Sequence, residues 1–314
     1  MYKRMRELFE LSRAIQSCIV GAVGKPEPAY TAKLVSDLPQ KANGIFKTRG
    51  FGFGGAFIHQ RPCVTPVKEK SGCELGDLLI FCHRIVQGED RYNAQLLQLK
   101  KMGEEVGSVR VDPRALQYRL YTEWPEFRMT RPKLPDHYDI DPKAATPGAM
   151  YALIDEHNAD MCSIPLCDRA FIANSCTLPR IAVVAPDPVM QFDCWLSLAA
   201  DIIAVMGWQG GRPVCKYEDL QGCQDRWSRL IWDLLWETLD APFTCAAAGY
   251  PRTAKGNRLS KDLTAHLKWL KRCAESGQVA EAPTFAKEIS GVSEGRDDEG
   301  FGLLIIDEGA GETA

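Results

Sequence analysis

Asp77, Gln98 and Lys100 are polar residues beside or within two apolar segments, LLIFC (78–82) and NAQLLQLKK (93–101). Both segments predict buried strands. Because side chains alternate along a strand, Gln98 and Lys100 point to one face and the neighbouring leucines point to the other. An ionised carboxylate beside such an apolar run is costly unless a positive group meets it, either a Lys or Arg or a metal ion. We therefore expect Asp77 to lie beside Gln98 and Lys100, on a neighbouring strand.

These residue types suit a metal ion that acts on phosphate. Mg²⁺, or Mn²⁺ in its place, binds a few protein oxygens and keeps several waters. Asp77, Gln98 and the backbone carbonyl of Leu99 supply such ligands. The ion would polarise a phosphate oxygen and lower the pKa of a bound water. Lys100 would orient that water or stabilise the charge that develops on the phosphate.

A neutral Gln98 leaves Asp77 as the main negative charge, so we expect a second acid to contribute. Glu74 precedes Asp77 in the segment CELGD, and Gly76 allows the strand to bend and bring the two carboxylates together. The alternatives are two acids on the first predicted helix, Glu7 and Glu10.

The stretch GCELGDLLIF…AQLLQLKK resembles the signature of the PD-(D/E)xK, or restriction-endonuclease-like, superfamily. That signature has an Asp at the start of one core strand, a variable gap, (D/E/Q)-x-K on the next strand, and then a helix. Here Asp77 matches the first part, Gln98–Lys100 the second, and a predicted helix at 113–124 the third. The predicted elements over residues 4–155 match the αβββαβ layout of that superfamily. Two positions depart from the motif, because Gly replaces the Pro and Gln replaces the acid.

The resemblance implies a Mg²⁺-dependent endonuclease that hydrolyses phosphodiester bonds, with DNA expected as the substrate and RNA left open. It assigns catalysis to Asp77, Gln98 and Lys100, with Glu74 as the additional acid. Bacterial defence against phage is the corresponding expectation, with either a homo-oligomer or a defence-system partner protein supplying a second site. Two alternatives remain. One is an inactive nuclease-fold subunit that binds nucleic acid or serves as a scaffold, and the other is a structural ion pair between Asp77 and Lys100.

Charge is distributed unevenly along the chain. Residues 1–134 contain 22 Lys and Arg against 14 Asp and Glu, whereas residues 135–314 contain 16 against 27. The balances are +8 and −11. A basic half suits a surface that binds phosphates, and binding through it should weaken steeply with salt. The expected phosphate contacts are Arg49, His59, Arg61 and Lys101.

Cysteine and histidine chemistry is not indicated. The chain has 12 cysteines but no CxxC pair, so neither a zinc site nor a disulfide framework is predicted. Many of the cysteines lie in apolar runs, where Cys behaves as a small hydrophobic residue. No Cys or His lies on a strand–turn–helix elbow of the kind that presents a nucleophile.

The surrounding pattern predicts an α/β fold, with a restriction-endonuclease-like mixed sheet (αβββαβ core) flanked by helices. Apolar residues at helical spacing mark the helices, and alternating or continuous apolar runs mark the strands. Helices are predicted at 4–22, 30–38 and 113–124, a glycine-rich loop at 41–55, and strands at 56–60, 73–83, 93–101, 150–154 and 180–185.

We divide the chain into three parts. A nuclease-like α/β core spans residues 1–186, and a mostly helical C-terminal part packed on it spans 187–285. An acidic tail at 286–314 contains a possible late strand at 301–307. Within the second part, helices are predicted at 190–208, 225–239 and 259–273.

The segment 225–239 is apolar almost all round, so it forms either a deeply buried helix or a surface that contacts a partner. Replacing Trp232 and Trp236 with polar residues would distinguish these alternatives, because a buried helix would unfold and a contact surface would only lose its partner.

No apolar run reaches the length of a membrane span, since the best candidate, 196–208, is short and contains Asp201. Acids interrupt the N-terminal segment, so we expect a cytoplasmic protein without a membrane partner.

Overall fold

The structure of the chain is a computed structural model that contains both α-helices and β-strands. It describes residues 2–58, 62–102, 108–129, 137–144, 146, 148–156, 179–191, 197–222, 226–240, 268 and 301–308. The helices are α1 (Tyr2–Ile19), α2 (Glu27–Phe46), α3 (Leu116–Glu123), α5 (Leu198–Met206) and α6 (Arg226–Asp240), with short 3₁₀ turns at η1 (Val20–Ala22), η2 (Lys47–Arg49) and η4 (Tyr217–Gln221).

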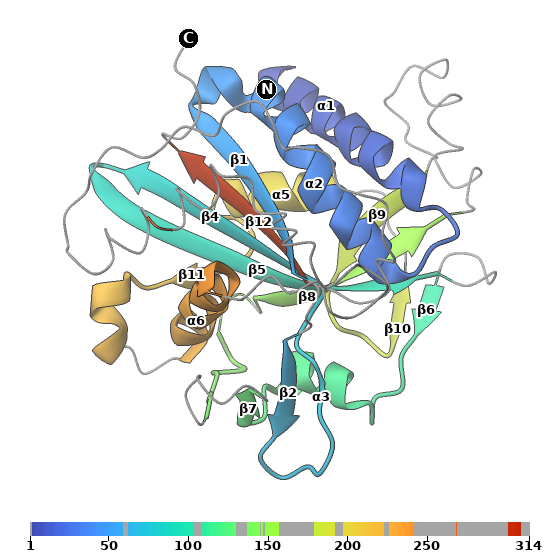
Figure 1. Cartoon of the computed structure of the whole chain (residues 1–314), viewed down its shortest axis with the longest axis vertical. Coiled ribbons are helices and arrows are strands. Elements are labelled where there is room, and N and C mark those ends of the chain that lie inside the picture. The colour runs from blue at the N-terminus through green and yellow to red at the C-terminus, as the bar shows by residue number, and fades with distance from the viewer. Residues whose placement is uncertain are drawn as a thin grey trace, which may run out of the picture.

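A mixed sheet of seven strands forms the centre of the molecule (Figure 1). In spatial order the strands are β1 (Phe51–Ile58), β12 (Phe301–Glu308), β4 (Leu78–Val86), β5 (Glu89–Lys101), β8 (Ala149–Asp155) and β9 (Arg180–Val184), and β11 (Arg212–Val214) pairs with the first part of β5. The β12–β4 and β5–β8 pairs are parallel, and the other pairs are antiparallel. The coarse prediction of an α/β fold with a mixed sheet is confirmed.

Two further sheets are small. One pairs β10 (Val189–Gln191) with β6 (Ser108–Arg110). The other places β2 (Cys63–Pro66) between β3 (Cys73–Glu74) and β7 (Phe127–Met129). It lies near α3, below the main sheet in Figure 1.

Both faces of the main sheet are covered. On one face, alternate residues of the sheet such as Ile80 and Leu97 pack against α1, α2 and α5. On the other face, the intervening residues such as Phe81 and Leu96 pack against α3 and α6. This alternation explains why β4 reads as a continuous apolar run, because its two sets of side chains enter two separate cores.

The glycine-rich segment differs from the prediction. The helix predicted at 30–38 is the middle of the longer helix α2, and FGFGG belongs to strand β1 and not to a loop. A Cβ on Gly55 would lie 1.8 Å from the backbone oxygen of Val35 on α2. Glycine is therefore required because α2 crosses β1 at very short range.

The late strand predicted at 301–307 is present as β12 and lies inside the sheet, between β1 and β4. The segment 187–285 contains α5 and α6, but also β10 and β11. The helix predicted at 259–273 lies outside the described residues, apart from Lys268. Among the helices that the structure describes, none combines the length and the apolar character needed to span a bilayer.

Candidate functional site

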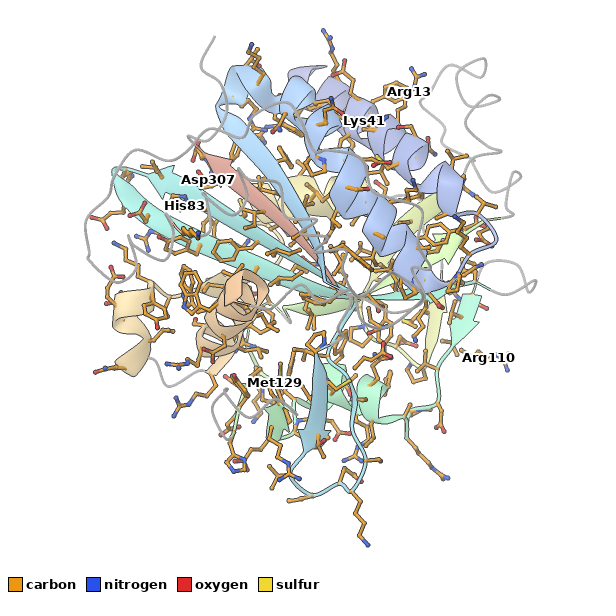
Figure 2. All side chains as sticks on the ribbon, in the orientation of Figure 1. Arg13, Lys41, His83, Arg110, Met129 and Asp307 are labelled. Atoms are coloured by element: carbon orange, nitrogen blue, oxygen red, sulfur yellow. The ribbon has the colours of Figure 1, made fainter. Side chains whose placement is uncertain are left out.

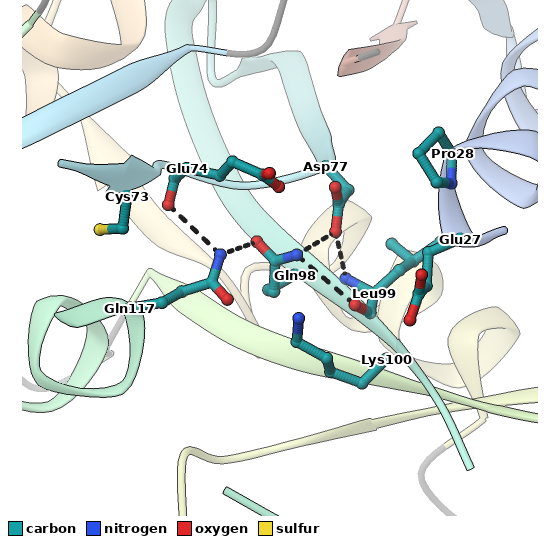
Figure 3. Close-up of a pocket in the computed structure, with 9 residues that line it drawn as sticks. All are labelled: Glu27, Pro28, Cys73, Glu74, Asp77, Gln98, Leu99, Lys100 and Gln117. Atoms are coloured by element: carbon teal, nitrogen blue, oxygen red, sulfur yellow. Dashed lines mark hydrogen bonds between the residues drawn. The ribbon is translucent and has the colours of Figure 1, made fainter. Parts of the chain in front are cut away.

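A pocket of about 280 Å³ lies at the end of the main sheet where β4 begins (Figure 3). The first turn of α2, the end of β5, α3 and the short strand β3 surround it. All the catalytic residues predicted from the sequence are in it. The lining residues are Glu27, Pro28, Cys73, Glu74, Asp77, Gln98, Leu99, Lys100 and Gln117.

The Asp77 carboxylate continues the β4–β5 ladder beyond its end. The last paired residues of the two strands are Leu78 and Leu97, so the Leu99 N–H has no residue of β4 opposite it. Asp77 Oδ2 accepts a hydrogen bond from that N–H at 2.7 Å and another from the Gln98 side-chain amide. Asp77 is only 2 % exposed. Donation from these N–H groups compensates for the loss of water around the buried carboxylate.

The backbone before β4 is held as tightly as the side chain. The Asp77 N–H donates to the Leu97 carbonyl at 2.9 Å, and the Tyr121 hydroxyl of α3 donates to the Leu75 carbonyl at 2.7 Å. A Cβ on Gly76 would lie 2.9 Å from that hydroxyl, so this close approach requires glycine. Burial raises the pKa of Tyr121 well above its usual value, and the nearby Asp77 charge adds to the effect.

Gln98 links Asp77 to α3 through a second amide. Its Oε1 accepts a hydrogen bond from Gln117 Nε2, and the same Nε2 donates to the Glu74 carbonyl at 3.3 Å. The two amides therefore orient each other. Figure 3 shows the resulting row of hydrogen bonds from Glu74 through Gln117 and Gln98 to Asp77.

Lys100 enters the pocket from the same face of β5 as Gln98, and its ammonium points toward the Gln98 amide (Figure 3). Its ammonium forms no hydrogen bond or ion pair with any residue that the structure describes. The structural alternative of an ion pair between Asp77 and Lys100 is therefore not what is observed. A partly buried ammonium without a protein partner can bind a phosphate oxygen or a water.

Two further carboxylates lie in the pocket. Glu74 points toward Asp77 from β3, and Glu27 enters from the first turn of α2, where its Oε1 accepts a hydrogen bond from the Lys101 N–H at 3.3 Å. The helix acids considered from the sequence, Glu7 and Glu10, do not line the pocket and form ion pairs with arginines.

The predicted phosphate contacts are dispersed. The Lys101 ammonium forms an ion pair with Glu156 at 2.9 Å, so it is already partnered. Arg49 precedes β1 at the end of the sheet opposite the pocket, where it pairs with a glutamate of α1 at 3.2 Å. His59 and Arg61 lie outside the described residues.

The donor atoms in the pocket fit a hard cation. The carboxylates of Asp77 and Glu74, the Gln98 amide and the Leu99 carbonyl offer oxygen only, which is the donor set of Mg²⁺ and Mn²⁺. In the described part of the chain, no three His, Cys, Asp or Glu side chains gather as a metal-binding group. An ion here would therefore rely on few carboxylates and on water.

The Gln98 amide must turn over for its oxygen to face the same ion as Asp77, because its NH₂ group now donates to Asp77. Gln117 can follow that rotation, since its own amide has both a donor end and an acceptor end. The Gln98–Gln117 pair thus stays hydrogen-bonded in either orientation.

Among the pocket residues that sequence reasoning missed are two with hydrogen-bonding side chains, Glu27 and Gln117. Glu27 follows a proline at the start of α2, which is a helix-start signal, and Gln117 lies on the helix predicted after the motif. Neither signal places the side chain beside Asp77, because that depends on how the helices pack.

No family model, curated protein or solved structure matches the chain.

Proposed function

We propose that the protein is a metal-dependent endonuclease that hydrolyses phosphodiester bonds, with DNA as the expected substrate. The observation that carries the proposal is the meeting of Asp77, Gln98 and Lys100 in one pocket, where the Lys100 ammonium has no partner among the described residues. A phosphoryl-transfer site needs oxygen ligands for a cation and a positive group for the phosphate, held within a small volume. These three residues supply both.

The strand arrangement supports a restriction-endonuclease-like core. The strand after Asp77, β4, pairs antiparallel with β5, which carries Gln98 and Lys100. The chain then forms α3 and returns as β8, which pairs in parallel with β5. This order of two motif strands, a helix and a parallel strand is the order that the resemblance implies.

Asp77, Gln98 and the Leu99 carbonyl would hold Mg²⁺ or Mn²⁺, with Glu74 or Glu27 as the additional acid. When bound, the ion supplies positive charge that polarises a phosphate oxygen and makes a coordinated water more acidic. The Asp77 main chain is held by hydrogen bonds to Leu97 and Gly302, and its carboxylate accepts a hydrogen bond from the Leu99 N–H. These bonds fix the carboxylate in place.

The remaining residues act on the substrate directly or through Gln98. In hydrolysis, a water oxygen bonds to phosphorus while the bond to the leaving sugar oxygen breaks. Lys100 binds the attacking water or a non-bridging phosphate oxygen, where negative charge develops. Gln117 would orient Gln98 through the amide–amide hydrogen bond, which the two side chains can keep after Gln98 turns its oxygen toward the ion.

The test is cleavage of plasmid DNA, linear DNA and RNA by purified protein, with Mg²⁺, with Mn²⁺ and with a chelator. We expect cleavage only with the metal, and we expect Asp77→Asn to abolish it and to weaken Mn²⁺ binding in calorimetry. Asn has nearly the same shape as Asp but lacks the charge. Asp219→Asn is the control, because Asp219 is exposed on η4 and does not line the pocket.

Cleavage that continues in the chelator, or in Asp77→Asn, would contradict the proposal. Wild-type protein that binds nucleic acid without cutting any substrate would favour the inactive, binding subunit instead.

A further inference from the structure

Strand β12 contacts the candidate site although it is far from Asp77 in the sequence. The Gly302 N–H donates to the Asp77 carbonyl at 2.7 Å, and Gly302 faces Leu78 at the start of the parallel β12–β4 pair. On the other side, the Asp77 N–H donates to the Leu97 carbonyl. The main chain of Asp77 is therefore held between β12 and β5.

The same strand connects another part of the pocket to the sheet. Among the described strands, β1 pairs only with β12, from Phe51 opposite Glu308 to Ile58 opposite Phe301. Helix α2 packs across β1 and β12, and its first turn places Glu27 in the pocket. Strand β12 thus joins the unit that carries Glu27 to the strands that carry Asp77 and Gln98.

Gly302 lies where these parts meet. A Cβ at this position would lie 2.4 Å from Thr31 Cγ2 and 3.0 Å from Val35 Cγ1 on α2, and 3.2 Å from Leu78 Cδ1 on β4. The first of these distances is far shorter than van der Waals contact, so a side chain would displace α2, β12 or both. The missing side chain is what allows α2 to pack this closely.

We propose that β12 is a positioning element of the candidate active site, with Gly302 as its positioning residue. The Gly302 N–H sets the position of Asp77, and the absence of a side chain sets the position of α2 and therefore of Glu27. The pocket then assembles only when β12 is seated between β1 and β4. The effect on cleavage rests on the proposed function, whereas the mechanical coupling is a property of the fold.

Gly302→Ala tests the coupling in the full chain. We expect cleavage to fall at least about tenfold and Mn²⁺ binding to weaken, because small displacements of catalytic groups are costly. The double variant Thr31→Ala/Gly302→Ala removes the closest obstructing atom and should recover part of both losses. Gly44→Ala is the control, because Gly44 lies on α2, as Thr31 does, and a Cβ at Gly44 would meet nothing within 4 Å.

Hydrogen exchange supplies a readout that does not need activity. In Gly302→Ala, we expect hydrogen exchange to become faster at residues 24–30 and at 76–80 together, with no change in α6. In the double variant, exchange at both segments should return toward the wild-type rate. Normal exchange and cleavage in Gly302→Ala, no recovery in the double variant, or a uniform rise that includes α6 would each overturn the proposal. If wild-type protein neither cleaves nor binds metal, the proposed function fails, and the exchange pattern still decides whether β12 positions the pocket.

Discussion

Lys100 and Lys101 are adjacent in sequence but have different electrostatic surroundings. The Lys100 ammonium enters the pocket and has no partner in the part of the chain that the structure describes, whereas Lys101 forms an ion pair with Glu156 beside the start of α2. We expect Lys100→Met to reduce the cleavage rate by about 100-fold or more without lowering the melting temperature, because a positioned acid–base or charge-stabilising group contributes on this scale. Single-turnover kinetics and thermal unfolding measure the two effects.

Lys101→Met is the comparison for that variant. Loss of its ion pair should lower the melting temperature and reduce cleavage much less than Lys100→Met does. Equal losses of cleavage rate in the two variants would show that Lys100 and Lys101 both contribute only general positive charge.

At this scale, part of the site can be read from the sequence. Asp77, Gln98 and Lys100 can be predicted to meet because strand alternation and neighbouring strands place them on one face. Glu27 and Gln117 cannot, because their positions depend on where α2 and α3 pack. The same holds for Arg49, whose place at the far end of β1 follows from a strand register that no local pattern reveals.

The elements follow the same division. Strands β4 and β5 are predictable from apolar runs, but the glycine content of FGFGG predicts a loop, because glycine usually weakens a strand. Here tertiary packing overrides that preference, since α2 lies too close to β1 for a side chain at Gly55. The place of β12 inside the sheet is equally non-local, because its partners β1 and β4 come from the beginning of the chain.

A buried histidine, His83, links β4 to β12 and β5 at the end of the sheet opposite the pocket. Figure 2 shows His83 of β4 beside Asp307 of β12. Both ring nitrogens of His83 contact carboxylates, with Asp307 at 3.1 Å and Asp90 of β5 at 2.9 Å. Burial alone lowers the pKa of His83, but the hydrogen bonds to Asp307 and Asp90 outweigh it and raise the pKa to about 9. Lys216 acts on the same cluster through Asp90.

The pKa of His83 is higher in the folded chain than its ordinary value of 6.5, so its contribution to stability is complete below pH 6.5 and is lost as the pH rises through about 9. We expect the melting temperature of the wild type to fall over this window. His83→Gln should be less stable at neutral pH and should show a flatter profile. Thermal unfolding at a series of pH values measures both, with the exposed His137→Gln as the control.

A His83→Gln profile that parallels the wild type would show that other groups cause the pH dependence. Exchange at residues 301–308 gives a local check, because loss of the His83–Asp307 contact should loosen β12 before α6.

On the scale of the whole molecule, the sheet separates two cores, and the tryptophans of α6 belong to one of them. Trp227 and Trp232 are buried, and Trp236 is partly buried against the same cluster. Trp232 stacks edge-on against Phe81 and Tyr92 of the sheet. Of the two alternatives for this helix, burial is the one observed for Trp227 and Trp232.

Trp232→Ala distinguishes a core residue from an interface residue. The Trp232 ring is 1 % exposed, and its Nε1–H donates to the Cys215 carbonyl at 2.9 Å. Truncation leaves a cavity and an unpaired carbonyl, so we expect the free energy of unfolding to fall by about 3–5 kcal/mol. Denaturant unfolding measures this loss, and Trp236→Ala should lose less because its side chain is only partly buried. Light scattering should give the same mass for folded Trp232→Ala as for the wild type. A variant of normal stability but reduced mass would instead place α6 at an interface between chains.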